Sequence, residues 1–401
     1  MVRSVSFTKS IAELHEELRD FHEFGSKTVL SQTKSGVPVY TNEFWTSKQR
    51  AAHALHEISY RACFKPQLPR FFIERLTRPG DWVYDPFLGR GTTVLEAVLL
   101  GRKAAGNDIN PLSRILAEPR LHPPTLEAVR ERLATVDWSA KVDPPEELLV
   151  FYHPETLQEV AALRFYLESR AELQSNDAVD DWIRMVATNR LTGHSVGFFS
   201  VYTLPPNQAV SVVRQQKINA SRSQIPPRRD VRGIILKKTA SLLRHVALPE
   251  GSTGRFFTGS AMMQSPLEVG SVSLVVTSPP FLDVVDYAGD NWLREWFNGI
   301  APVARTQSRL QLDWKIEMTR CFRELARVLR DDGLIAFEVG EIDRGRIQME
   351  ELVIPASAEA GLVPHLVLVN AQAFTKTANV WGVSNRTKGT NTNRVVLLGK
   401  A

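Results

Sequence analysis

The 401-residue sequence has little of what marks a secreted or membrane protein. Its two cysteines, Cys63 and Cys321, form neither a disulfide framework nor a zinc-binding spacing. No apolar segment follows a basic start, and no apolar run is long enough to span a bilayer. We therefore expect a cytoplasmic protein without a signal peptide or a membrane-spanning helix.

The sequence also has no large excess of either charge. It contains 49 lysines and arginines and 44 aspartates and glutamates, which gives a formal net charge of +5. This mild basicity is compatible with a nucleic-acid partner but does not identify one. His53 and His56 have a spacing seen in metal sites, but no third ligand is evident, so we expect a structural role and no metal. The length allows two domains, or one domain with a large insertion.

A glycine-rich loop stands between a predicted strand and a predicted helix. The strand is 82–85, the loop is Pro86-Phe87-Leu88-Gly89-Arg90-Gly91-Thr92-Thr93, and the helix is 94–100. The two glycines let the backbone pass close to a ligand, and the helix N-terminus favours an anionic group such as a carboxylate. A second strand, 104–108, ends in Asp108, where an acid accepts hydrogen bonds from ribose hydroxyls. A dinucleotide dehydrogenase uses the same geometry, but its third glycine is replaced here by Val94.

A second string of interest follows the apolar run 272–276, which predicts a buried strand. It reads Thr277-Ser278-Pro279-Pro280-Phe281. The two prolines lack a backbone N–H, so the strand pairing cannot continue through them and a helix cannot form there. The expected result is a rigid elbow that displays a hydroxyl, a proline carbonyl and an aromatic face. These groups suit the binding of a planar base by its exocyclic amino group. Ser-Pro-Pro also occurs as an ordinary strand-ending loop.

Both strings resemble motifs of the DNA amino-methyltransferase family, the first its S-adenosylmethionine loop and the second its catalytic motif. The resemblance covers about residues 60–110 and 254–400. It implies a class I methyltransferase fold, which is a Rossmann-like, doubly wound, mostly parallel α/β sheet with a C-terminal antiparallel pair, here with a largely helical insertion. Family members with Ser at the position of Ser278 mostly methylate cytosine N4, and members with Asp or Asn there mostly methylate adenine N6.

The resemblance also implies the site residues. S-adenosylmethionine would be bound by Phe64, Asp85, Phe87, Gly89, Gly91, Thr92, Asp108 and Ser260. Phe64 begins the segment 64–69, which resembles the family segment over the methionine end of the cofactor, although a simple loop between helices is the alternative. Ser260 stands near a position where the family often has an acid. The catalytic residues would be Ser278, Pro279, Pro280 and Phe281.

The expected mechanism follows from the weak nucleophilicity of an exocyclic amino group. Ser278 and the Pro279 carbonyl would each accept an amino hydrogen, and Phe281, where Tyr is commoner, would stack on the base. The base must be flipped out of double-stranded DNA to be reached. The leading hypothesis is a site-specific cytosine-N4 DNA methyltransferase of a restriction-modification system, with a cognate restriction endonuclease as a further partner. The alternatives are an adenine-N6 DNA or RNA methyltransferase, and an inactive methyltransferase fold that binds DNA.

A basic segment at 205–245 predicts where DNA would bind, because it has nine basic residues and one acid, Asp230. The candidate phosphate contacts are Arg214, Lys217, Arg222, Arg228 and Arg229. A solvated helix face is the alternative. The polar, basic loop at 376–393 could also touch DNA or be an exposed hairpin loop.

The order of these features predicts four segments. They are an N-terminal extension at 1–45, the cofactor-binding half at 46–118, a helical insertion for target recognition and DNA binding at 119–253, and the catalytic half at 254–401. Outside the motifs, the sequence predicts an amphipathic helix at 11–24, a polar connector before about residue 40, and a helix from Ser47 toward Tyr60. It also predicts a strand at 334–339, directly after Asp331-Asp332-Gly333.

Overall fold

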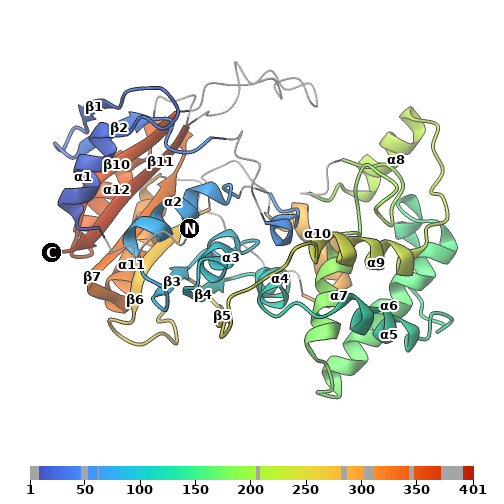
Figure 1. The fold of residues 1–401 in the computed structure, drawn as a ribbon. Helices are drawn as coiled ribbons and strands as arrows, with labels where there is room; N and C mark the ends of the chain where they lie inside the picture. The colour runs from blue at the N-terminus through green and yellow to red at the C-terminus, as the bar shows by residue number, and fades with distance from the viewer. Residues whose placement is uncertain are drawn as a thin grey trace.

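A nine-stranded sheet forms the centre of the protein. The computed structural model describes residues 9–46, 53–61, 63–204, 208–280, 287–301, 311–342, 347–371 and 392–401. The strand order of the sheet is β1-β2-β10-β11-β7-β6-β3-β4-β5 (Figure 1). Its strands are β1 (Val29–Gln32), β2 (Pro38–Asn42), β3 (Trp82–Asp85), β4 (Lys103–Asp108), β5 (Gly254–Thr258), β6 (Val272–Thr277), β7 (Leu329–Val339), β10 (Leu362–Ala371) and β11 (Thr392–Lys400). A separate two-stranded pair joins β8 (Glu341–Ile342) to β9 (Ile347–Gln348).

The direction of the strands confirms the predicted fold class. Strands β3 to β7 pair in parallel, whereas β11 is antiparallel to both β7 and β10. Strand β3 lies in the middle of these five strands. The next two strands in the chain, β4 and β5, lie on one side of it, and the following two, β6 and β7, lie on the other side. The order therefore reverses between β3 and β6, and open α/β sheets bind their ligands at the carboxyl ends of the strands at such a point.

Helices cover both faces of the sheet. Along β6 all six residues are buried, with Leu274 and Val276 in one core and Val275 in another. A strand that is covered on both faces reads as a continuous apolar run, which is why the sequence predicted it. One face packs against α1 (Ile11–Asp20), α2 (Gln67–Leu76) and α3 (Thr92–Leu99). The other packs against α11 (Gln311–Val328) and α12 (Glu350–Ala358).

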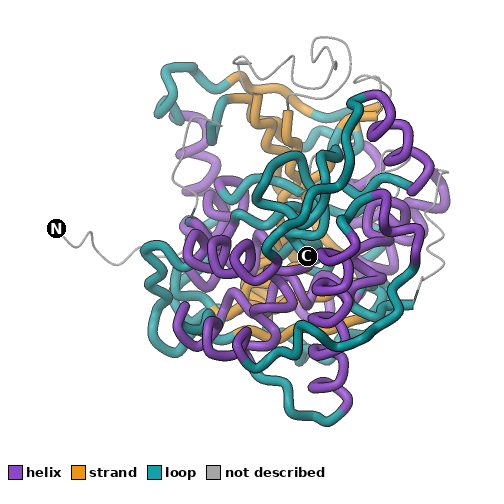
Figure 2. Tube along the Cα trace, turned by 90° about the vertical axis from the view of Figure 1, so that its right-hand side faces the viewer, coloured by secondary structure: helices purple, strands orange, loops and turns teal. Residues whose placement is uncertain are grey.

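A second group of helices, which we call the helical lobe, has a core of its own beside the sheet (Figure 1). In Figure 2 its helices and loops lie in front of the strands. It consists of α4 (Pro111–Ala117), α5 (Leu126–Ala134), α6 (Pro154–Glu172), α7 (Ala178–Thr188), α8 (Val212–Ser221), α9 (Val231–Leu242) and α10 (Tyr287–Phe297). Helices α5 to α9 leave the sheet between β4 and β5, where the sequence predicted a helical insertion. The borders of the four predicted segments stay a prediction.

The described helices include none that is both long and apolar enough to cross a membrane.

Three local predictions need correction. The connector before residue 40 contains β1 and β2, and β2 extends the sheet by pairing in parallel with β10. The described part of the helix expected from Ser47 to Tyr60 is only a 3-10 turn, Ala54–His56, and residues 47–52 lie outside the described residues. Strand β7 begins at Leu329, ahead of the expected start at Leu334. In each case pairing or packing with distant segments decides the local structure, which local residue patterns do not encode.

Candidate active site

The two predicted motifs leave the sheet side by side. Strands β3 and β6 are parallel neighbours, with Tyr84 opposite Val275, so their carboxyl ends reach the same edge. Asp85 ends β3 directly before the glycine loop, and Thr277 ends β6 directly before Ser278. The structure therefore brings the predicted cofactor loop and the predicted catalytic elbow together. Phe281 lies outside the described residues.

Asp108 is bonded to the glycine loop. Gly89 has φ +50° and donates its backbone N–H to Asp108 Oδ2 at 2.9 Å. The other carboxylate oxygen of Asp108 accepts the N–H of Asn110, also at 2.9 Å. The loop and the end of β4 thus form one unit, because Leu88 also donates its N–H to the carbonyl of Asn107.

Gly91 fits where a larger residue would not. It has φ +76°, and a Cβ added to it would lie 2.7 Å from Ala117 Cβ and 3.1 Å from Arg120 Nη2. Helix α3 starts at the next residue, Thr92, whose buried hydroxyl accepts from Arg90 Nε at 3.1 Å. The glycine is therefore required for helix packing as well as for an open approach to the loop.

Two arginines that the sequence did not single out hold residues 55–58 and Phe64 against the glycine loop. Arg90 donates to the carbonyl of Ile58 at 2.9 Å and to that of Phe64 at 3.5 Å. Arg120 is fully buried and donates to the carbonyls of Leu55 and Arg90, and burial lowers its pKa to about 9. These contacts bring Phe64 beside the loop. Arg90 occupies a variable position of the motif, so no sequence signal separated it from a solvent-exposed arginine.

His56 is bonded to α3, the helix that follows the glycine loop. His56 Nε2 donates to Glu96 Oε1 at 2.6 Å, and Arg70 donates to the other oxygen of Glu96 at 2.9 Å. Burial lowers the pKa of His56 to about 4. Among the described side chains there is no group of three or more that could hold a metal ion.

The predicted catalytic serine contacts an acid that the sequence analysis missed. Ser278 Oγ donates to Glu338 Oε2 at 2.6 Å, and Asn393 Nδ2 donates to Glu338 Oε1 at 3.1 Å. Glu338 is only 5% exposed, and this burial raises the pKa of its carboxyl group. An acid near the end of the otherwise apolar run 334–339 was the signal that could have identified it, because buried charges cluster at functional sites.

Asp85 is buried at the same edge. Its Oδ1 accepts from Thr277 Oγ1 at 2.6 Å and from the N–H of Phe87 at 3.1 Å. Asp85 is 2% exposed, and burial raises its pKa to about 7. Its carboxylate therefore faces the first residue of the elbow string and the backbone of the glycine loop.

Ser260 follows β5 and lies near the end of β4, and its predicted contact with the cofactor stays a prediction. The end of β5 pairs Thr258 with Asp108, and Asn107 Nδ2 donates to the carbonyl of Gly259 at 2.9 Å. The Ser260 hydroxyl accepts the N–H of Met262 at 3.2 Å.

The predicted DNA contacts lie in the helical lobe, apart from the two motifs. Arg214 and Lys217 are exposed on α8, at the upper right of Figure 1. Arg222 stacks on the ring of Tyr202, with its guanidinium carbon 3.8 Å from the ring centroid. Arg228 pairs with Glu155 and Glu159, and Arg229 donates its backbone N–H to Thr156 Oγ1 at 2.9 Å. The charge of Arg228 is thus already compensated within the lobe.

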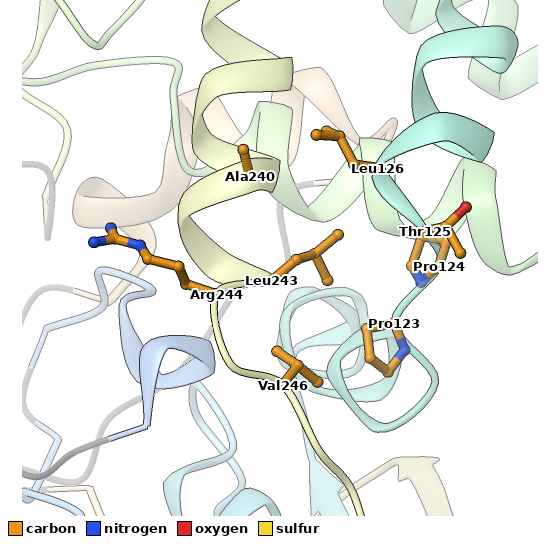
Figure 3. Close-up of a pocket in the computed structure, with 8 residues that line it drawn as sticks. All are labelled: Pro123, Pro124, Thr125, Leu126, Ala240, Leu243, Arg244 and Val246. Atoms are coloured by element: carbon orange, nitrogen blue, oxygen red, sulfur yellow. The ribbon is translucent and has the colours of Figure 1, made fainter.

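A groove of about 530 Å³ lies between the end of α9 and the start of α5 (Figure 3). Its lining is mainly apolar: Pro123, Pro124, Thr125, Leu126, Ala240, Leu243, Arg244 and Val246. None of the predicted site residues lines it, so it is separate from the candidate active site.

Comparison with known proteins agrees with this geometry. Residues 14–116 match the family model N6_N4_Mtase, described as DNA methylase, and this range contains the glycine loop and Asp108. The match confirms the resemblance to the DNA amino-methyltransferase family. Ser278 and Glu338 lie beyond the matched range.

Three curated relatives are type II methyltransferases. M.MjaII of Methanocaldococcus jannaschii is 32% identical over 88 residues, which is 22% of this chain and 17% of that protein. M.BsoBI of Geobacillus stearothermophilus is 23% identical over 279 residues, or 61% of this chain and 52% of that protein. M.XycI of Xanthomonas campestris pv. cyanopsidis is 39% identical over 67 residues, or 17% of this chain and 22% of that protein. The chain therefore spans about half or less of the length of these relatives.

Solved structures that match the chain at low similarity are methyltransferases. A TehB-like SAM-dependent methyltransferase from Corynebacterium glutamicum is 8% identical with a TM-score of 0.32, covering 83% of this chain and 87% of that chain. The rRNA methyltransferase aviRa from Streptomyces viridochromogenes is 11% identical with a TM-score of 0.31, covering 86% of this chain and 89% of that chain.

Gly91→Ala tests the packing of the glycine loop. We expect it to lower the free energy of unfolding by about 1–3 kcal/mol more than Gly89→Ala, because it adds overpacking against Ala117 and Arg120 to the strain of a positive φ. At Gly89 an added Cβ has no neighbour closer than 3.7 Å, so that variant measures the φ strain alone. Urea denaturation measures both. Equal losses in the two variants would show that α4 does not pack on Gly91.

Proposed function

We propose that this protein is an S-adenosylmethionine-dependent DNA methyltransferase that modifies the N4 amino group of cytosine, as part of a restriction-modification system. One observation carries the proposal: the glycine loop and the Ser278 elbow leave the same edge of the sheet, and buried Glu338 holds the hydroxyl of Ser278. The similarity to type II methyltransferases supports the same activity.

The residues at this edge fit S-adenosylmethionine. The N-terminus of α3 favours the carboxylate of the methionine part, and Asp108 suits the ribose hydroxyls. The bonds that Asp108 accepts from Gly89 and Asn110 hold its carboxylate at the end of β4, directly beside the glycine loop. When bound, the cofactor supplies an activated methyl group for the amino nitrogen.

Ser278 and Glu338 form a path for the proton that the amino group must lose. The hydroxyl of Ser278 donates to Glu338 Oε2, which leaves the lone pairs of Oγ for a hydrogen of the target amino group. As the nitrogen gains a methyl group, its proton passes to Ser278 Oγ while the hydroxyl proton passes to Glu338 Oε2. The Pro279 carbonyl would accept the second amino hydrogen, and Phe281 would stack on the flipped base.

We expect DNA treated with the enzyme to contain N4-methylcytosine, and Ser278→Ala to lose most of this activity while it binds the cofactor normally. The lost hydroxyl acts on the amino group during transfer, so turnover falls without a loss of cofactor binding. Mass spectrometry of digested DNA identifies the product, and calorimetry measures cofactor binding. Phe281→Tyr is the control, since it keeps the aromatic face. If N6-methyladenine were the only product, the cytosine assignment would fail and the adenine alternative would stand.

Glu338→Gln should slow methyl transfer by about 10²-fold or more, the usual scale of general base catalysis. Glutamine preserves the shape of the side chain and can accept a hydrogen bond, but it cannot accept the proton from Ser278. Glu338 accepts a proton only when it is ionised, and burial raises its pKa. The wild-type single-turnover rate should therefore increase as the pH rises through the pKa of Glu338. The Gln variant should lack this limb of the pH profile. A variant that kept the limb would exclude Glu338 as the proton acceptor.

For DNA binding we propose the exposed cations of α8. Arg214→Gln with Lys217→Gln should weaken DNA binding and reduce the dependence of log K on log salt by about two units or a little less, because two phosphate contacts are lost. Filter binding at several salt concentrations measures the slope. The control is Arg114→Gln with Arg130→Gln, which removes equal charge from two arginines that are ion-paired with Glu118 and Glu127. The same slope in the α8 variant and the wild type would show that α8 faces away from DNA.

A further inference from the structure

A buried hydrogen bond joins the two loops of the candidate site. We infer that Asp85 and Thr277 act as a pair of positioning residues that set the catalytic elbow relative to the cofactor loop. This inference rests on the proposed function. It differs from the predicted cofactor contact of Asp85, because here Asp85 acts through Thr277 and the backbone of Phe87.

The pair lies at the ends of the neighbouring strands β3 and β6, where the two motifs begin. Thr277 Oγ1 donates to Asp85 Oδ1 at 2.6 Å, and the two residues are 0% and 2% exposed. The same oxygen of Asp85 accepts the N–H of Phe87, two residues into the glycine loop. One carboxylate oxygen therefore connects the end of β6 with the start of the cofactor loop.

A second hydrogen bond supports this connection from helix α3. Thr93 Oγ1 donates to the carbonyl of Val276 at 2.9 Å, and both residues are fully buried. The start of α3 is thus bonded to the second-last residue of β6, and the last residue of β6 is bonded to the last residue of β3. A shift of the elbow relative to the loop has to break at least one of these bonds.

Transfer of a methyl group requires this kind of control. The reacting atoms must be aligned and about 3–3.5 Å apart, and a misplacement of about 1 Å costs about 10²-fold in rate. Ser278 follows Thr277 directly, and Pro279 and Pro280 restrict the backbone after it. A displacement of Thr277 is therefore passed to the Ser278 hydroxyl and is not absorbed by a flexible linker.

The test compares Thr277→Val, which removes the donor at nearly constant volume, with Thr277→Ser, which restores it. In the 401-residue protein with saturating S-adenosylmethionine and DNA, we expect Thr277→Val to lower the single-turnover rate at least about tenfold. Its dissociation constant for S-adenosylmethionine should change less than about twofold, and Thr277→Ser should recover most of the rate. The control is Thr77→Val, another fully buried threonine, which follows α2 at the opposite end of β3.

Three results would overturn the inference. The first is a wild-type rate in Thr277→Val, and the second is a Thr277→Ser variant as slow as Thr277→Val. The third is a loss of cofactor affinity as large as the loss of rate, which would mean that the bond only supports the cofactor site.

A measurement without DNA separates this inference from the proposed function. Burial raises the pKa of Asp85 to about 7 from its ordinary value of 3.8, and the charged or titratable groups that face it are Asp108 and Tyr84. The folded protein thus binds a proton that the unfolded chain releases, so the free energy of unfolding should fall as the pH rises from about 4 to about 7. Asp85→Asn should remove this decline. Thr277→Val should extend it above pH 7, because the lost hydrogen bond favoured the charged carboxylate.

Urea denaturation at a series of pH values measures this decline. If the wild-type protein methylated no DNA, the proposed function would fail while the pH series would still test the bond. If Thr277→Val and the wild type had the same pH dependence, the bond would be absent in solution and the inference would fail.

Discussion

The candidate site depends on one constraint, which is the parallel pairing of β3 with β6 at the point where the strand order reverses. Residues 85 and 277 are far apart in the sequence, yet each ends a strand at the same edge. The loops that follow must then share one volume of space. Strand β7 pairs with the other side of β6 and brings Glu338 to the same edge, so three segments meet there.

Two buried carboxyl groups give this edge its chemical character. Asp85 and Glu338 are both nearly inaccessible to water, and burial raises the pKa of each. A buried acid is costly unless it is hydrogen-bonded, and here Thr277, Ser278 and Asn393 donate to them. Such perturbed acids cluster at functional sites, because proton transfer near neutral pH requires them.

Helix α10 connects the rest of the helical lobe with residues beside the glycine loop. It is the first described element after the elbow, and the carbonyl of Asp290 accepts the N–H of Ala209 from the region between α7 and α8. Arg294 donates to the carbonyl of Ser59, beside the glycine loop, at 3.2 Å. Trp292 donates to the carbonyl of Val210 at 3.2 Å. A movement of the lobe would therefore act on Ser59, beside the glycine loop, through Arg294.

The sequence by itself determined the strands of the two motifs, the loops after them and the helical character of the insertion. These features are local: a continuous apolar run, glycine or proline directly after it, and amphipathic spacing in the helices. Only the tertiary structure decided that Ser278 contacts Glu338, that Arg120 is buried under the glycine loop, and that Arg228 is paired with acids. It also added β2 to the sheet. These contacts join residues that are far apart in the chain. They are determined by strand order and burial, and a local pattern of residues determines neither.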